Sequence, residues 1–410
     1  MNSAERHEAR YQRRKAAREA KRRKRLDVYD NIDRVASIPA LTRANFDARR
    51  GVMWKASVAR YDAHFLKFAV MQSRDLYTGK FKCSGFFVFW IVERGKRRHV
   101  HSLHYAERVI RRSFCINALV PILSSGLIYD NGASLSGKGV SFAVNRCAAH
   151  LHQYFRETGN NEGYVLIIDF KGYFDHILHK PLMEIIDRYV TDPALNRVVK
   201  MFISASDADK TENEKGKGLY IGPEDSQIYA ISYPSRIDHQ IKDGWGLRFY
   251  ARYNDDSYIM LKDKDKLLEY KRQLFQMYDA LGIIPNQKKT QVVKISRGFT
   301  YLKTKYFLTD TGKVIMKPDH DSIVRERRKL KKLKKFYDQD IMTIQQVSQQ
   351  YMSWRGSILK KDAYRSVEHM DSLFFLLFGV RPWKKKKKKK GRKKETWTKK
   401  ENALPQKSRH

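Results

Sequence analysis

The sequence predicts an α+β protein, and three features of the chain indicate this class. Residues 165–168 form a short, continuous apolar run of branched side chains, which is typical of a buried strand. Residues 249–253 and 257–260 are rich in aromatic and β-branched side chains and flank Asn254-Asp255, as in a tight hairpin. Residues 325–335 place leucines three positions apart among basic side chains, as in an amphipathic helix.

The composition of the 410-residue chain supports a folded core and excludes some classes of protein. Hydrophobic residues make up 42% and aromatic residues 12%, which excludes wholesale disorder. No run of about 18 apolar residues is present, so we expect no membrane span. The N-terminal segment is basic and lacks the apolar region of a secretory signal. Cys83, Cys115 and Cys147 lie far apart, which fits a reducing compartment, and we expect a cytoplasmic protein.

The formal net charge of +39 makes a polyanion the first partner to consider. Residues 1–30 carry +6 and residues 381–410 carry +13, which leaves +20 for residues 31–380. We expect residues 10–25 to be a basic helix or arm that orders on RNA; the alternative is a solubilising tail. Seven consecutive lysines, 384–390, predict a disordered tail that binds phosphates or serves as a localisation signal.

Beyond these runs, the chain shows two loops and two further helices. Residues 130–139 and 207–218 are loops by composition. Residues 321–335 and 343–360 are expected to be helices, the first with Leu330 and Leu333 on its docked face.

Three carboxylates carry the chemistry that the sequence suggests. Asp169 ends the predicted buried strand, and Asp255 and Asp256 lie at the tip of the predicted hairpin. If the strands pair, the three side chains meet, and their mutual repulsion is relieved by hard divalent cations that prefer oxygen ligands. Three carboxylates can hold two Mg²⁺ ions about 4 Å apart for in-line nucleotidyl transfer. The alternatives are ordinary turn residues for Asp255-Asp256 and a surface loop for Asp169.

Motifs around these carboxylates resemble those of reverse transcriptases. Tyr253-Asn254-Asp255-Asp256 is similar to their Tyr-x-Asp-Asp box, and Asp169–Asp175 (DFKGYFD) is similar to their first catalytic motif. The separation of 86 residues between Asp169 and Asp255 is what their palm domain requires. Other family features follow in the same order: Lys96-Arg97-Arg98 (the basic fingers motif), 131–139 (NGASLSGKG), 218–227 (GLYIGPEDSQ), 281–290 (LGIIPNQKKT) and the primer grip 298–302 (GFTYL).

The resemblance covers residues from about 50 to about 375 and is strongest to the bacterial and phage branch: retron, group II intron-like, diversity-generating and phage-defence enzymes. It implies a right-hand polymerase fold whose palm is an antiparallel sheet with helices. The implied parts, with the two terminal segments, are a basic N-terminal arm 1–30, fingers 31–160, palm 161–310, helical thumb 311–380 and disordered tail 381–410.

The resemblance also implies roles for single residues. Asp169, Asp255, Asp256 and the Phe170 backbone carbonyl are the implied ligands of Mg²⁺, with Mn²⁺ as the alternative ion. Lys289 is similar to the lysine that protonates pyrophosphate, and Lys288 is its rival.

The nucleotide contacts implied by the family are Lys96, Arg98, Phe174, Ile221 and Gly222. Phe174 is similar to the steric gate that excludes a 2′-hydroxyl; its alternative is a core aromatic on a half-buried strand. The alternative for Lys96 and Arg98 is a solvated face. The primer end would be steadied by Gly298, Phe299, Tyr301 and Leu302.

Three departures from the family pattern are present. Ile221 stands where many relatives have glutamine before Gly222, and this pattern resembles the error-prone diversity-generating enzymes. Loss of the amide predicts lower fidelity. Asn254 replaces the usual Ala, Met or Val, and Lys303 follows Leu302 where many relatives have glycine.

The function implied is an RNA-directed DNA polymerase of a prophage or anti-phage defence system. Its expected partners are an RNA template, a cognate structured noncoding RNA, the RNA–DNA duplex product, deoxynucleotides and a small accessory protein, with no membrane. The alternatives are a diversity-generating enzyme, a template-independent polymerase and an RNA-binding, maturase-like protein. His99 and His101 would share one face of a strand, either as a metal site or as fingers surface.

Overall fold

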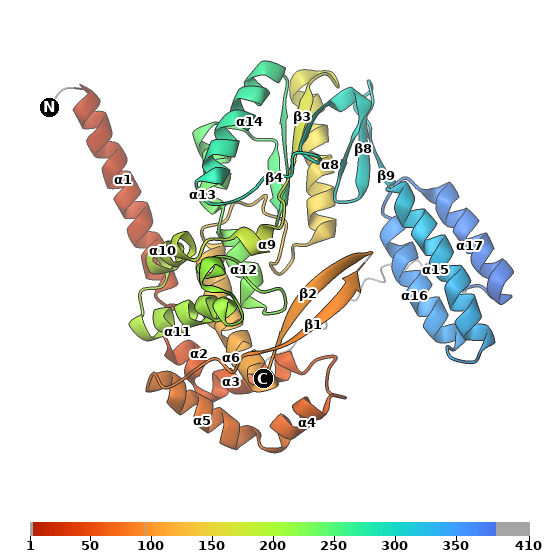
Figure 1. Ribbon diagram of the computed structural model, residues 1–410. Helices are drawn as coiled ribbons and strands as arrows, with labels where there is room; N and C mark the ends of the chain where they lie inside the picture. Colours follow the sequence, from red (N-terminus) through yellow and green to blue (C-terminus); the bar gives the residue numbers. More distant parts are fainter. Residues whose placement is uncertain (1–2, 94, 383–410) are drawn as a thin grey trace, which may run out of the picture. The chain divides into compact units, whose positions relative to one another are not determined.

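The computed structural model describes residues 3–93 and 95–382, and the chain divides into two compact units, Met1–Asp319 and His320–His410 (Figure 1). The expected disordered tail lies outside the described residues from 383 onward. Within the described part, no helix has the length and apolarity needed to cross a bilayer. The three cysteines are free thiols.

The first unit is mixed helix and sheet. Its helices are α1 (Ser3–Leu26), α2 (Asp33–Ala36), α3 (Ile38–Ala48), α4 (Ala56–Ala63), α5 (Phe65–Tyr77), α6 (Tyr105–Phe114), α7 (Val120–Ser124), α8 (Val140–Thr158), α9 (Tyr173–His176), α10 (His179–Tyr189), α11 (Pro193–Ser204), α12 (Asp225–Ser232), α13 (Ser235–His239) and α14 (Lys264–Asp279). Its strands are β1 (Phe86–Glu93), β2 (Lys96–Leu103), β3 (Tyr164–Asp169), β4 (Tyr250–Tyr253), β5 (Asp256–Leu261), β6 (Gln291–Lys294), β7 (Phe299–Tyr301), β8 (Thr304–Leu308) and β9 (Val314–Pro318). Single turns of π or 3₁₀ helix cover Cys115–Leu119, Ala205–Asp207, Glu212–Glu214, Gln240–Gly244 and Ile295–Arg297.

The strands form three antiparallel sheets. The central sheet has four strands in the order β4-β5-β3-β6. Strands β7, β8 and β9 form a second sheet, and β1 pairs with β2 in a separate hairpin. Helix α14 packs against β3 and helix α8 against β4.

Strand β3 confirms the predicted buried strand and shows why its apolar run is continuous. Leu166 and Ile168 belong to one hydrophobic cluster, whereas Val165 and Ile167 belong to a second cluster, which also includes residues of α8 and β7. Successive side chains of a strand point to opposite faces. Both faces of β3 are therefore covered, and every position must be apolar until the strand ends at Asp169.

The second unit holds the helices α15 (His320–Asp338), α16 (Ile344–Ile358) and α17 (Tyr364–Phe378). The predicted amphipathic helix is confirmed, because Leu330 and Leu333 of α15 are buried in the cluster of this unit. Thr343 starts α16 with a reciprocal capping box to Gln346. The first unit extends to Asp319, because β9 pairs with β8.

Candidate active site

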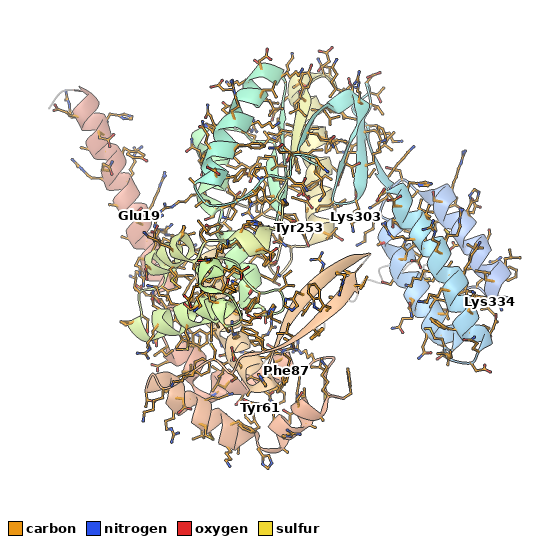
Figure 2. The ribbon with its side chains drawn as sticks, in the orientation of Figure 1. Glu19, Tyr61, Phe87, Tyr253, Lys303 and Lys334 are labelled. Carbon is orange, nitrogen blue, oxygen red and sulfur yellow. The ribbon has the colours of Figure 1, made fainter. Side chains whose placement is uncertain are left out.

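The register of the central sheet brings the three predicted carboxylates to one edge. Strand β3 ends at Asp169, which lies opposite Asp256, the first residue of β5. Asp255 is in the two-residue turn that joins β4 to β5, and its carbonyl accepts a hydrogen bond from the Phe170 backbone N–H (3.2 Å). The predicted hairpin is thereby confirmed, and Tyr253, labelled in Figure 2, pairs with Asp256.

The turn explains one departure from the family pattern. Asn254 has a φ of 52°, in the left-handed region. Asparagine adopts this conformation with less strain than alanine, methionine or valine, because its short polar side chain bonds locally. Asn254 therefore suits the hairpin that carries Asp255.

Asp169 is held by two groups from the segment between α14 and β6. The Lys289 ammonium lies 2.6 Å from Asp169 Oδ2, and Asn286 Nδ2 donates to Oδ1 at 3.0 Å. The Asn286 backbone N–H donates to the Asp169 carbonyl at 2.7 Å. Lys289 is the predicted lysine, and 53% of its side chain remains exposed, so it can exchange the carboxylate for another anion.

The electrostatics of the three carboxylates favour a cation. Burial raises the pKa of Asp256 to about 7, and the charges of Asp255 and Asp169 add to the rise. Burial and the charge of Asp169 also raise the pKa of Asp255. Burial lowers the pKa of Lys289, but its hydrogen bond to Asp169 and the nearby carboxylates outweigh this, so the pKa is raised.

The donor set fits a hard divalent ion, although its present geometry does not form a metal cluster. Among the described residues, no group of three or more His, Cys, Asp or Glu side chains has metal-binding geometry. Asp169 is turned to Lys289 and Asn286 instead. Carboxylates and an adjacent backbone carbonyl are nevertheless the oxygen donors that Mg²⁺ prefers.

The raised pKa of Asp256 predicts a pH dependence of stability. Its pKa is about 7 in the folded protein against 3.8 ordinarily, so the folded state binds the extra proton. This group therefore lowers stability as the pH rises from about 4 to about 7, by on the order of 1 kcal/mol per pH unit. In EDTA, the melting temperature of the wild type should fall as the pH rises, relative to the melting temperature of Asp256→Asn. Parallel curves for the two proteins would contradict the assignment.

A cleft of about 1110 Å³ opens beside these carboxylates. The predicted site residues that line it are Arg98, Asp169, Phe170, Phe174, Ile221, Asp255 and Lys289. Arg98 stands on β2, facing solvent and paired with Glu93 at 3.1 Å. Lys96 begins β2, but its side chain lies outside what the structure describes. Lys288 is not among the lining residues, which favours Lys289 for the predicted role.

Phe174 lies on the short helix α9. Its alternative role, a core aromatic on a half-buried strand, therefore assumed the wrong element. Its ring is half-buried against the main hydrophobic cluster, and its backbone carbonyl accepts from Leu219 N (2.8 Å). The ring therefore borders the cleft from a fixed position.

Gly222 lies where the backbone of β2 comes closest to the segment 218–222. Its φ is 144°, and a Cβ at this position would lie 2.2 Å from the His101 carbonyl oxygen. The His101 N–H donates to the Ile221 carbonyl at 3.0 Å. Glycine is thus required for close contact, and Ile221 is held at the cleft wall.

His101 is a residue that sequence reasoning misplaced. It is 4% exposed, so the surface interpretation is wrong for it. Its ring stacks on Tyr220 with centroids 3.6 Å apart, and its Nε2 lies 3.1 Å from Asp209 Oδ2. The paired placement with His99 was visible in the sequence, but Asp209 is 108 residues away in the chain. His101 therefore fastens the loop 207–218 to β2.

The predicted primer-grip residues form the hairpin β7–β8. Phe299 and Tyr301 are buried in the core of the first unit. A Cβ on Gly298, whose φ is 74°, would lie 2.6 Å from the Tyr306 carbonyl oxygen. Leu302 and Lys303 form the turn with φ of 45° and 56°, so any contact with a primer would come from this turn and the backbone (Figure 2).

A buried ion pair behind the β4–β5 hairpin was not predicted. Arg252 of β4 and Asp238 of α13 are 0% and 1% exposed. The Arg252 guanidinium donates to Asp238 at 2.5 and 2.9 Å and to the Ile231 carbonyl at 2.7 Å. It also donates to the Asn254 carbonyl at 3.2 Å. This pair ties the turn of Asp255 to α12 and α13.

The fold and the site together define the class of protein. Carboxylates from two paired strands meet at one edge of an antiparallel sheet, beside a cleft with a basic strand on its wall. This is the arrangement of a nucleotidyltransferase with a palm.

A comparison with protein-family models matches part of the chain. The model described as "Reverse transcriptase (RNA-dependent DNA polymerase)" matches residues 118–306. The chain therefore carries a reverse-transcriptase domain, and enzymes with this domain are RNA-directed DNA polymerases. Its mixed helix and sheet structure is the right-hand polymerase fold. The matched segment includes Asp169, Asp255, Asp256 and Lys289.

Comparison with curated proteins finds no match. Solved structures that resemble the fold include three telomerases. The apo enzyme from Candida tropicalis truncated from its C-terminal domain is 15% identical with a TM-score of 0.43, covering 56% of this chain and 54% of that chain. The Candida albicans enzyme in complex with the TWJ fragment of telomeric RNA is 11% identical with a TM-score of 0.46, covering 74% and 61%. The apo enzyme from Candida tropicalis is 14% identical with a TM-score of 0.45, covering 58% and 49%.

Proposed function

We propose that the whole chain is an RNA-directed DNA polymerase that adds deoxynucleotides to a primer 3′-hydroxyl on an RNA template. The observation that supports this most directly is the pairing of Asp169 with Asp256 beside Asp255, within a segment that the reverse-transcriptase model matches. In the reaction, the 3′-oxygen bonds to the α-phosphorus, and the bond from that phosphorus to pyrophosphate breaks.

The described side chains have separate tasks in this proposal. Asp169, Asp255, Asp256 and the Phe170 carbonyl would hold Mg²⁺, or Mn²⁺ as the alternative. Bound there, the ion supplies positive charge for the primer hydroxyl and the triphosphate. Lys289, released from Asp169, would carry the proton for the leaving pyrophosphate. A lysine ammonium stays protonated at neutral pH without that contact.

Binding of the ion can be measured without catalysis. Calorimetric titration with Mg²⁺, and the rise of the melting temperature in Mg²⁺ over EDTA, should both give a signal for the wild type. Primer extension on an RNA template should then depend on the same ion. Extension that continues in excess EDTA would overturn the assignment of these carboxylates.

The position of Phe174 predicts sugar discrimination. Its ring borders the cleft beside Asp169, so it would lie under the sugar of the incoming nucleotide. Phe174→Ala should admit a 2′-hydroxyl and raise the ratio of ribonucleotide to deoxynucleotide incorporation by about 100-fold or more, equivalent to about 3 kcal/mol. The measurement is single-nucleotide incorporation of each substrate. Phe174→Tyr, which keeps the ring, is the control, and an unchanged ratio in Phe174→Ala would reject the role.

The position of Ile221 predicts low fidelity. Its side chain faces the cleft and offers no hydrogen bond to a templating pair. Ile221→Gln should lower the misincorporation frequency opposite adenine by about 10-fold, the effect of about 1.4 kcal/mol. Sequencing of extension products from both proteins tests this. Ile221→Val should misincorporate like the wild type, and equal error spectra for Ile221→Gln and wild type would reject the hypothesis.

The setting proposed for this activity is a prophage or anti-phage defence system, with a cognate structured noncoding RNA and a small accessory protein. The Ile221-Gly222 pattern instead favours a diversity-generating enzyme of the bacterial and phage branch. Sequencing RNA that co-purifies with the protein would separate the two: one recurrent structured RNA supports defence, and a repeat copied with changes at adenine supports diversity generation.

A further inference from the structure

Helix α1 carries a row of arginines that the proposed function leaves without a task. Arg6, Arg10, Arg14, Arg18 and Arg22 follow one another at intervals of four residues, so successive arginines adjoin on the helix surface and the row turns by about 40° at each step. We call these five residues the arginine row. Each step rises about 6 Å, and the row is about 24 Å long. The helix has eleven Lys and Arg against three Glu, a net charge of +8 over 24 residues.

Arg6, Arg10, Arg14 and Arg18 of the row are open to solvent, whereas Arg22 is half-buried. From residue 5 to residue 21, the described side chains of α1 are exposed apart from the half-buried Ala9. In the part of the chain that the structure describes, no ion pair joins Arg10, Arg14 or Arg18 to an acidic side chain. Like charges four residues apart destabilise a helix by about 0.2–0.5 kcal/mol per pair. A bound polyanion would offset this repulsion between the arginines.

The C-terminal end of α1 is fixed to the body of the first unit, so the row has a defined direction (Figure 1). The Arg23 guanidinium donates to Asp30, to the Thr191 hydroxyl and to the Tyr189 carbonyl (3.2 Å). Leu26 is buried at the same point. The helix is therefore a positioned arm and not a free tail.

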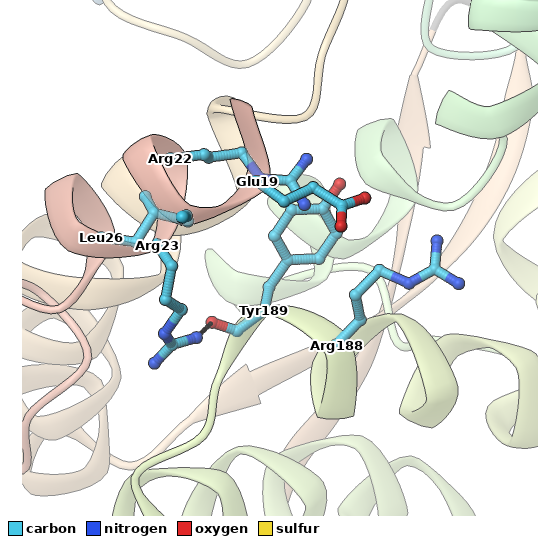
Figure 3. A pocket seen from close by; sticks show the side chains of 7 residues that line it. Glu19, Arg22, Arg23, Leu26, Arg188 and Tyr189 are labelled. Carbon is cyan, nitrogen blue, oxygen red and sulfur yellow. Dashed lines mark hydrogen bonds between the residues drawn. The ribbon is translucent and has the colours of Figure 1, made fainter. Parts of the chain in front are cut away.

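The basic surface continues from the arm onto α10. Figure 3 shows the hollow at the base of α1, where the Arg22 guanidinium lies 5.1 Å from the centre of the Tyr189 ring. Arg188 lines the same hollow, together with Glu19, its one acidic lining residue among those described. Two arginines from different helices thus border one open depression.

This surface is separate from the catalytic cleft. The hollow is at the C-terminal end of α10, whereas the cleft residues Asp175 and His176 precede its N-terminal end. An 11-residue helix is about 16 Å long. A nucleic acid bound along α1 would therefore occupy a second site on the chain.

We propose that the arginine row and Arg188 bind the backbone of a double-stranded segment of the template RNA, outside the cleft. Measured along the axis of a duplex, one strand has a phosphate about every 3.4 Å. The arginine row has a guanidinium about every 6 Å, which is close to the spacing of every second phosphate. Guanidinium groups bind phosphate oxygens in pairs. That the polyanion is RNA rests on the proposed function.

The test is the salt dependence of RNA binding by the full chain. The probe is an RNA hairpin with a 20-base-pair stem, and the variant is Arg10→Gln/Arg14→Gln/Arg18→Gln, which keeps good helix formers. We expect hairpin affinity to fall at least about 10-fold at 0.15 M salt, and the slope of log affinity against log salt to drop by about 2 to 3. Extension of a DNA primer on a short unstructured RNA should change less than about twofold.

Two controls keep the result specific. Arg10→Lys/Arg14→Lys/Arg18→Lys retains the charge and should bind the hairpin within a few-fold of wild type. Lys262→Gln/Lys264→Gln/Lys266→Gln removes the same charge near the start of α14 and should bind like wild type. Equal losses in the α1 and α14 variants, an unchanged slope in the α1 variant, or a loss confined to duplex DNA of equal length would each overturn the proposal. Because RNA binding is read without DNA synthesis, failure of the polymerase proposal would be seen separately.

Discussion

Asp255→Asn is expected to lower DNA synthesis by at least about 1,000-fold, the effect of about 4 kcal/mol on the barrier. Asp255 lies at the tip of the β4–β5 hairpin beside the end of β3, where charge for binding a metal ion is concentrated. Asparagine keeps the shape of the side chain but removes one negative charge from the site. The measurement is the single-turnover rate of primer extension with Mg²⁺.

Binding and folding distinguish this loss from a general defect. Asp255→Asn should melt no lower than wild type in EDTA, because the mutual repulsion of buried carboxylates is reduced. It should also bind the hairpin RNA with unchanged affinity. A variant that retains more than a tenth of the wild-type rate would show that Asp255 is not a catalytic ligand.

Asp238→Asn is expected to destabilise the protein by about 3–5 kcal/mol, because it leaves the buried Arg252 guanidinium without its counter-charge. Both side chains are inaccessible to solvent, so water cannot replace the lost carboxylate. Tyr250 also donates to Asp238, at 2.5 Å, and would lose a charged acceptor. Chemical unfolding followed by circular dichroism measures the change.

The matched control is Asp243→Asn. Asp243 pairs with His239, which lies four residues earlier in the chain, and the Asp243 side chain is 74% exposed. Exposed ion pairs contribute about 0–1 kcal/mol, so this variant should unfold close to wild type. If Asp238→Asn also unfolded within about 1 kcal/mol of wild type, the pair would not be the support of the hairpin that its geometry indicates.

The central part of the site was predictable because its determinants are local. The apolar run before Asp169 required a strand covered on both faces, and Asn254-Asp255 between two aromatic stretches indicated a tight hairpin. In the register that the folded chain adopts, antiparallel pairing of the two strands places Asp169 opposite Asp256. The basic arm and the helices after residue 320 were likewise evident from charge and leucine spacing.

The supports of the site were not predictable, because their partners come from distant segments. Nothing near Asp238 in the sequence marks it as the partner of Arg252, since α13 and β4 meet only in the folded chain. His101 and Asp209 are joined in the same way across the cleft wall. The burial of Phe299 and Tyr301, the expected primer-grip side chains, follows from alternation along a short strand that lies over a core.

The most direct test of the account is extension of a labelled DNA primer by the wild type on three substrates: an RNA template, a DNA template of the same sequence, and no template. We expect a product on RNA whose length and sequence follow the template, no product without a template, and loss of the RNA-directed product in Asp255→Ala/Asp256→Ala. A product of equal yield without template, or RNA-directed synthesis that survives in the double variant, would contradict it.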